Sequence, residues 1–169
     1  MLFRRCNALK AIAALAAATL WPTLAGAARR PVSVETMPCH GAPTPYRLLV
    51  TTQGVRTNHG YVVLNLYGAD KRRWLADKGW LNVVRDPAIP GDQTICLYLP
   101  TPGLYAVVMF QDSNANGDLD LGPLGPKEGY GFSNNVRPFL SAPSLDSALF
   151  PVSAGDTRLS IRLRYPPIS

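Results

Sequence analysis

Short hydrophobic runs recur along the chain from about residue 47 onward, and polar residues, prolines and glycines separate them. Runs of this length, rich in Val, Leu, Ile and Tyr and bounded by turn residues, are typical of β-strands. We expect strands at residues 47–52, 61–67, 94–99, 104–110, 148–152 and 158–165, with a possible seventh at 32–36. The pattern predicts an all-β protein, a single antiparallel β-sandwich of about six to seven strands, immunoglobulin-like or prealbumin-like.

Two of these runs predict which faces are buried. Residues 104–110 are apolar throughout, as in a central strand buried on both faces, and a long loop follows them. Residues 158–165 alternate instead, which predicts one buried face and one wet, basic face. The buried side would hold Leu159, Ile161 and Leu163, and the wet side Ser160, Arg162 and Arg164.

The connections between the runs are harder to assign. Residues 47–52 and 61–67 could pair as a hairpin, because only a polar loop separates them. Residues 71–84 could form a short helical turn or an irregular segment at the sheet edge. Residues 86–92 hold two prolines and a glycine, which predicts a loop.

The first 27 residues have the organisation of an export signal. Arg4, Arg5 and Lys10 precede an apolar run at 11–20, and small residues at 25–27 suit a signal peptidase. The run is short of the roughly 20 residues that a membrane span needs. We therefore expect a signal peptide at 1–27, one domain at 28–169, a periplasmic or secreted location and no membrane span after cleavage.

The charge of the chain excludes one class of partner. The formal net charge of +6 falls to +3 after cleavage, because residues 1–27 carry three basic and no acidic residues. No stripe of Lys and Arg with interleaved aromatic residues is present, so nothing favours nucleic acid.

Two cysteines remain in the exported part of the chain, Cys39 and Cys96. In an oxidising compartment they are candidates for a disulfide. It would close a loop of 57 residues and stabilise the fold by about 4 kcal/mol in the chain-entropy model. The alternative is two unrelated buried thiols.

The stretch 112–120 carries the strongest chemical signal. Oxygen-bearing side chains stand at every second position, and Gly117 stands where a tight turn around an ion needs it, which suits a hard cation such as calcium. Pro123 replaces the closing glutamate of an EF-hand, so Glu128 is the nearest candidate for that role. The candidate ligands are Asp112, Asn114, Asn116, Asp118 through its backbone carbonyl, Asp120 and Glu128. The alternative is a metal-free turn, because Asn-Gly is a strong turn signal and Asp and Asn side chains can bond turn backbones themselves.

Residues 127–135 have a different character. Two glycines flank a tyrosine, which lets backbone come close to another surface, and aromatic residues stand beside amides. This composition suits a contact surface for a carbohydrate or peptide, made by Tyr130, Phe132, Asn134 and Asn135. The alternative is an ordered loop whose aromatic residues cap the end of the sandwich.

Three segments together resemble a known family. They read Pro-Gly-Leu-Tyr-Ala-Val at 102–107, Asp-Ser-Asn-Ala-Asn-Gly-Asp-Leu-Asp at 112–120 and Gly-Pro-Lys-Glu-Gly-Tyr-Gly-Phe-Ser-Asn-Asn at 125–135. Their order and spacing resemble the exported bacterial family called domain of unknown function 2141. The resemblance implies an exported β-sandwich in a Gram-negative bacterium and no established activity. Ser113 stands where the family usually has Glu, at a position that would point away from an ion.

These observations favour a non-catalytic binding module over an enzyme. The chain has no Gly-x-Ser-x-Gly elbow and no histidine near a candidate nucleophile. We expect a module with a calcium-type loop that binds an unknown protein, glycan or envelope component. One alternative is a metal-dependent hydrolase that uses the Asp and Glu residues of 112–128. The other is a structural envelope component that presents the basic face of Arg158, Arg162 and Arg164.

Overall fold

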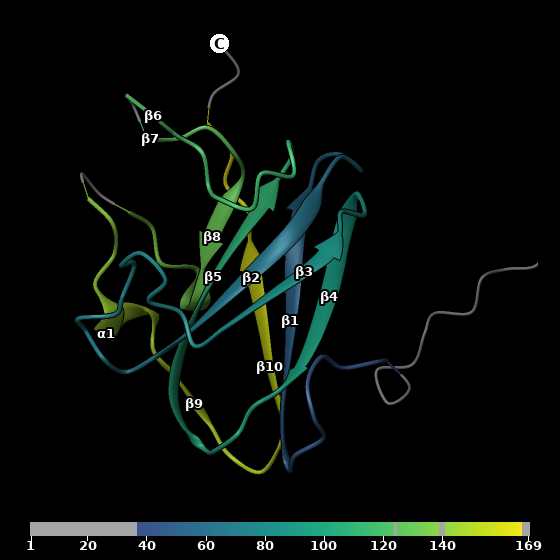
Figure 1. The fold of residues 1–169 in the computed structure, drawn as a ribbon, viewed down its shortest axis with the longest axis vertical. Helices are drawn as coiled ribbons and strands as arrows, with labels where there is room; N and C mark the ends of the chain where they lie inside the picture. The colour runs from purple at the N-terminus through teal and green to yellow at the C-terminus, as the bar shows by residue number, and fades with distance from the viewer. Residues whose placement is uncertain (1–36, 124, 139–140, 167–169) are drawn as a thin grey trace, which may run out of the picture. The chain divides into compact units, whose positions relative to one another are not determined.

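The protein contains two β-sheets that pack against each other (Figure 1). The structure is a computed structural model, and it describes residues 37–123, 125–138 and 141–166. The first sheet has the order β10 (Gly155–Arg162), β1 (Tyr46–Val55), β4 (Gly91–Tyr98). The second has the order β3 (Asn82–Pro87), β2 (Tyr61–Gly68), β5 (Gly103–Asp112), β8 (Tyr130–Phe132), and β9 (Phe150–Val152) also pairs with β5. The other described elements are the hairpin β6 (Leu121–Gly122) and β7 (Gly125–Pro126), the 3-10 turn η2 (Ser133–Asn135) and the helix α1 (Leu145–Ala148). The predicted β-sandwich is confirmed.

The predicted signal peptide at 1–27 and the possible strand at 32–36 lie outside the described residues. All of the described elements belong to one compact unit, Ser33–Ser169. In the described part of the chain, no helix has the length and apolar character needed to cross a membrane.

The main core lies between the two sheets and follows from strand alternation. The first sheet contributes side chains such as Leu48, Val50 and Ile161, each 0% exposed, and the second contributes Leu64 and Met109, also 0% exposed. Burying a side chain of this size contributes about 1.5–3 kcal/mol. This core fixes the register of each strand, because a slip by one residue would turn every apolar side chain outward.

The strand β5 is buried on both faces, as its apolar run predicts. Val107 and Met109 point into the main core, whereas Ala106 and Val108 belong to a second cluster on the outer face of the sheet. That cluster also contains Tyr67, Phe132, Leu145 and Ala148, with Trp74 and Trp80 packed against it. The segments that carry Trp74, Trp80, Leu145 and Ala148 therefore cover β5 from outside.

Three predictions about the connections need correction. The strands β1 and β2 do not form a hairpin: β1 pairs with β4 and β10, and β2 pairs with β3 and β5. The pairing of β1 with β10 is parallel, whereas the other strand pairings are antiparallel. Residues 82–87 form a strand at the sheet edge rather than an irregular segment and a loop. With β6, β7 and β8, this strand raises the count among the described residues to ten.

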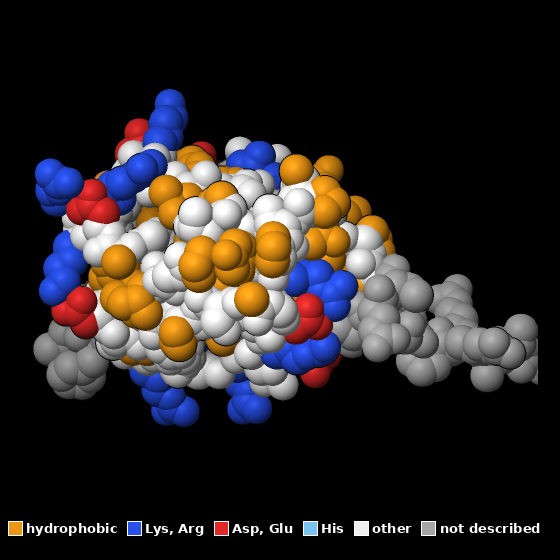
Figure 2. Space-filling view, turned by 90° about the horizontal axis from the view of Figure 1, so that it is seen from below, with side chains coloured by type: hydrophobic (Ala, Val, Ile, Leu, Met, Phe, Trp, Pro, Cys, Tyr) orange, Lys and Arg blue, Asp and Glu red, His pale blue; other side chains and the backbone are white. Residues whose placement is uncertain are grey.

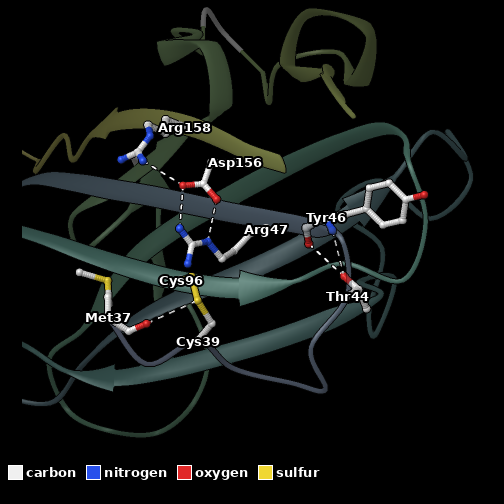
Figure 3. Close-up of a disulfide and its surroundings, with 8 residues drawn as sticks. All are labelled: Met37, Cys39, Thr44, Tyr46, Arg47, Cys96, Asp156 and Arg158. Atoms are coloured by element: carbon white, nitrogen blue, oxygen red, sulfur yellow. Dashed lines mark hydrogen bonds and ion pairs between the residues drawn. A yellow bond between two sulfur atoms is a disulfide. The ribbon is translucent and has the colours of Figure 1, made fainter. Parts of the chain in front are cut away.

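The predicted disulfide joins Cys39 to Cys96, with 4.5 Å between their Cα atoms (Figure 3). It attaches the segment before β1 to the outer face of β4, and the backbone of His40 pairs with β4 beside it. Nearby, Arg47 donates two hydrogen bonds of 2.7 Å to the carboxylate of Asp156. The start of β1 is thus held to β4 on one side and to β10 on the other.

Figure 2 views the end of the sandwich where β9 and the β4–β5 turn lie. Hydrophobic side chains cover much of the middle of this face, and Lys and Arg side chains lie mainly around its edge. Leu104 is 50% exposed here, and Pro100, Pro102 and Pro151 are exposed. Pro100 and Pro102 belong to the turn between β4 and β5, whereas Leu104 and Pro151 face each other on β5 and β9.

Candidate functional site

The acidic loop, residues 112–120, begins at the last residue of β5. Asp112 is 1% exposed, and its two carboxylate oxygens accept the backbone N–H groups of Asn116 at 3.1 Å and Gly117 at 2.8 Å. Gly117 has φ of +92°, a conformation that side chains disfavour. One buried carboxylate therefore closes the turn that the Asn-Gly signal predicts.

The two asparagines of the loop continue this closure. The side-chain oxygen of Asn114 accepts the N–H of Asn116, and that of Asn116 accepts the N–H of Asp118. Both side-chain amides donate to the carboxylate of Asp120, at 2.9 Å from Asn114 and 3.0 Å from Asn116. The structure thus brings four predicted ligands together, whereas the side chain of Asp118 is exposed.

Glu128 lies against this loop although it follows it by eight residues. It is 8% exposed, and its carboxylate accepts the N–H groups of Ser113 at 2.7 Å and Asp120 at 3.2 Å. Burial raises the pKa of Glu128 above its ordinary value, and the charges of Asp112 and Asp120 raise it further, while the two N–H groups oppose the shift. Glu128 thus joins the two ends of the loop through their backbone N–H groups, and its role as the closing ligand of an ion stays a prediction.

No Lys, Arg or His of the described residues forms an ion pair with Asp112, Asp120 or Glu128. The guanidinium of Arg85 instead donates to the carbonyl of Gly117 at 3.0 Å. Buried carboxylates are costly without a countercharge, and here N–H groups alone offset that cost.

The donor set of the loop fits a hard cation in its chemistry, since it consists of carboxylate and amide oxygens. Its present arrangement, however, is that of a hydrogen-bonded turn. In the described part of the chain, no three side chains of Asp, Glu, His or Cys form a group arranged to hold a metal ion. For an ion to bind, the carboxylate of Asp120 would have to exchange the N–H groups of Asn114 and Asn116 for the ion. The side-chain oxygens of these two asparagines would have to turn to the ion from the backbone N–H groups that they now accept.

An apolar groove lies beside the loop, with a cavity volume of about 590 Å³. Its lining includes Leu75, Leu119, Leu121, Pro126, Tyr130 and Phe132. Leu121 is 69% exposed and Leu75 is 38% exposed, which is unusual for side chains of this size. Sequence reasoning missed both leucines as parts of one surface, because they stand in segments 46 residues apart.

The glycines beside Tyr130 approach the chain itself rather than a partner. A Cβ atom at Gly129 would lie 2.3 Å from the ring of Tyr165, and one at Gly131 would lie 2.7 Å from the carbonyl oxygen of Arg162. Only glycine permits this contact between β8 and the end of β10. The close approach expected from the sequence is therefore internal.

Three of the four residues predicted to form a partner surface have structural roles. Phe132 is 5% exposed and packs between the rings of Trp74 and Tyr130. The Asn134 amide donates to the carbonyls of Ser147 and Leu149. The Asn135 side chain donates to the carbonyl of Ser160 and accepts the N–H of Arg162. These bonds give the two exposed asparagines a structural role, while their role in a partner surface stays a prediction. Tyr130 forms the half-buried edge of the groove.

Fold and site together define a small β-sandwich domain with an acidic loop at the end of its central strand and an apolar groove beside that loop. The family described as "Uncharacterized protein conserved in bacteria (DUF2141)" matches residues 50–160, more than half of the chain, and the chain belongs to this family. The resemblance noted in the sequence is thus confirmed. No curated protein and no solved structure matches the chain.

Proposed function

We propose that this chain is an exported, non-catalytic β-sandwich module that binds an envelope or extracellular protein, with its acidic loop stabilised by calcium. The observation that carries the proposal is the position of Glu128. Its buried carboxylate holds the acidic loop at Ser113 and Asp120, and it lies two residues before Tyr130 at the edge of the groove. An ion bound at the loop would thereby act on the groove.

The charge of the loop supports a cation. Asp112, Asp120 and Glu128 lie close enough for the first two to raise the pKa of the third. A divalent ion would neutralise this repulsion. The residues that would hold it are Asp112, Asn114, Asn116, Asp120 and Glu128 through side-chain oxygens and Asp118 through its carbonyl, the set that the sequence predicts. Its contribution would be to rigidify the loop.

The chemistry of the groove supports a protein as the partner. Its walls are mainly aliphatic and aromatic, and such walls match the apolar side chains of a polypeptide. The hydroxyl groups of a neutral glycan would find few hydrogen-bonding partners there.

Export is supported by two independent features. The N-terminal pattern suits a signal peptidase, and a disulfide such as Cys39–Cys96 persists in oxidising compartments. The family is bacterial, so the compartment we propose is the periplasm or the medium.

A thermal melt of the purified protein with 10 mM calcium and with a chelator tests the ion. For a dissociation constant of about 0.1–1 mM, calcium should stabilise the fold by about 1.4–2.7 kcal/mol, a rise in Tm of several degrees. The variant Asp120→Asn should abolish the rise. Asp118→Asn makes the same charge change in the same loop but keeps the backbone carbonyl, so this variant should retain most of the rise in Tm with calcium. An equal response of wild type and Asp120→Asn, or no response at all, would mean that the loop is a metal-free turn.

A photo-crosslinking side chain placed at residue 121 tests the partner in the living bacterium. We expect a discrete protein adduct at 121 and none at 104, an exposed leucine at the opposite end of β5. Adducts of equal yield at both positions would contradict a specific groove. Turnover of an esterase, glycosidase or phosphatase substrate that is lost in Asp120→Asn would instead establish the metal-dependent hydrolase.

A further inference from the structure

A second cavity, of about 660 Å³, lies at the end of the first sheet where β1 and β10 finish. Its lining includes Gln53, Arg56, Asp92, Arg162, Arg164 and Tyr165. It shares no residue with the apolar groove or the acidic loop. Most of its side chains are exposed or half-buried, so the cavity opens to solvent.

The parallel pairing of β1 with β10 explains why three arginines meet here. Gln53 stands opposite Arg162, so the C-terminal ends of both strands lie side by side. Arg56 follows β1 by one residue. Arg162 is the last residue of β10 and Arg164 follows it by two residues; both line the cavity, and Leu163 between them is buried. Residues about a hundred positions apart in the sequence therefore build one cationic wall.

Each arginine is placed differently, and donors remain available. The guanidinium of Arg56 lies over the ring of Tyr165, 4.0 Å from its centroid. That of Arg164 donates to the carbonyls of Asn135 and Val136. The guanidinium of Arg162 has no hydrogen bond or ion pair with the described residues. Guanidinium groups of this kind bind carboxylate and phosphate oxygens with paired N–H groups.

The opposite wall has the other sign of charge. Asp92 belongs to β4, and the strand order places β1 between β4 and β10. Two strand spacings, about 10 Å, therefore separate Asp92 from Arg162 of β10, with Gln53 of β1 between them. Arg56, which follows β1, stands at the end of the strand next to that of Asp92. The described residues show no ion pair between Asp92 and the arginines. A simple anion would use only one wall, whereas a ligand that also carries hydroxyl groups can donate to Asp92 and Gln53.

We propose that this cavity binds a saccharide that bears carboxylate or phosphate groups. Arg56 and Arg162 bind the oxyanion, Asp92 and Gln53 accept hydroxyl groups across the cavity, and Arg164 with Tyr165 holds the cationic wall in place. The volume lies within the range of about 300–1,000 Å³ that small-ligand sites occupy.

Calorimetric or NMR titration of the purified protein with trigalacturonate tests the site, with chelator present so that the acidic loop plays no part. Glucose 1-phosphate is the phosphate-bearing arm, and maltotriose and inorganic phosphate are the controls. We expect both acidic saccharides to bind more tightly than either control, with an affinity that falls as salt is added. Arg162→Gln should weaken binding about tenfold, the loss expected for a charge-assisted hydrogen bond.

Arg158→Gln is the matched control, because it removes the same charge from the same strand at a residue outside this cavity. It should change the affinity less than twofold. An equal loss in both variants would reduce the site to general surface charge. Maltotriose binding as tightly as trigalacturonate, or inorganic phosphate binding as tightly as glucose 1-phosphate, would also overturn the proposal. None of these outcomes bears on the calcium loop or the groove.

Discussion

The acidic loop at 112–120 and the segment at 129–135 are both candidate sites in the sequence, yet the structure uses their polar groups differently. In the loop, the side chains of Asp112, Asn114 and Asn116 bond groups no more than six residues away. In the segment, the amides of Asn134 and Asn135 bond groups 13 to 27 residues away, in α1, β10 and their flanks.

This difference indicates which of the two segments could bind a ligand and which one holds the fold together. Local bonds can be exchanged for bonds to a ligand without moving any strand. Long-range bonds hold elements together, so a ligand that took them would have to open the fold. Composition alone does not reveal the difference, because asparagines stand in both segments and the fold decides which groups they bond.

The largest expected effect on stability comes from replacing Phe132, in the segment at 129–135. Phe132→Ala should lower the free energy of unfolding by about 3–5 kcal/mol, because it leaves a cavity in the outer cluster of the second sheet. Leu121→Ala, at a 69% exposed position in the neighbouring groove, should change it by less than about 0.5 kcal/mol. Urea unfolding of both variants checks the pair. Equal, small losses would return Phe132 to the role of a surface contact.

The next effect concerns the close contact of β8 with β10. Gly131→Ala would place a Cβ atom 2.7 Å from both the Arg162 carbonyl oxygen and Cγ2 of Ile161, so we expect a loss of about 1–3 kcal/mol. Gly122→Ala is the control, since the nearest atom there belongs to the flexible Lys127 side chain. Thermal melts with chelator present should separate the two variants by several degrees.

The sequence predicts which face of a strand is buried better than it predicts which strands pair with each other. The alternation at 158–165 correctly gives Ile161 and Leu163 as buried, because the face of a residue depends only on its place in the strand. The hairpin of β1 with β2 is wrong, because the loop between them crosses from one sheet to the other and no local pattern records that crossing. In the candidate site, spacing located the turn around Asp112 and Gly117. The groove could not be predicted, since Leu75 and Leu121 meet only through the fold.

A smaller effect compares one asparagine from each region. Asn135→Ala should cost about 1–2 kcal/mol, because it breaks bonds to the Ser160 carbonyl and the Arg162 N–H. Asn114→Ala should cost less than about 1 kcal/mol with chelator present, since its bonds are local and exposed. Chemical unfolding measures both. A larger loss at Asn114 would show that the acidic loop is itself part of the scaffold.

The smallest effect is the pH dependence that Glu128 confers on stability in the presence of chelator. Its pKa in the folded state lies above the ordinary value of 4.5, because of burial and the neighbouring charges of Asp112 and Asp120. At a pH between 4.5 and the raised pKa of the folded state, Glu128 holds a proton in the folded state that it has released in the unfolded state. The free energy of unfolding therefore falls as pH rises through that window. Thermal melts of the wild type and of Glu128→Gln across this pH window measure the slope as the difference between the two proteins.

Two comparisons make that slope informative about the loop. Asp118→Asn, which removes an exposed carboxylate of the same loop, should keep the slope, whereas Glu128→Gln should lose it. Calcium should also remove it, because an ion held by Glu128 keeps the carboxylate ionised in the folded state. If the slope survived saturating calcium, Glu128 would not be a ligand. Glu128 would then belong with Asn135 among the side chains that only hold the fold.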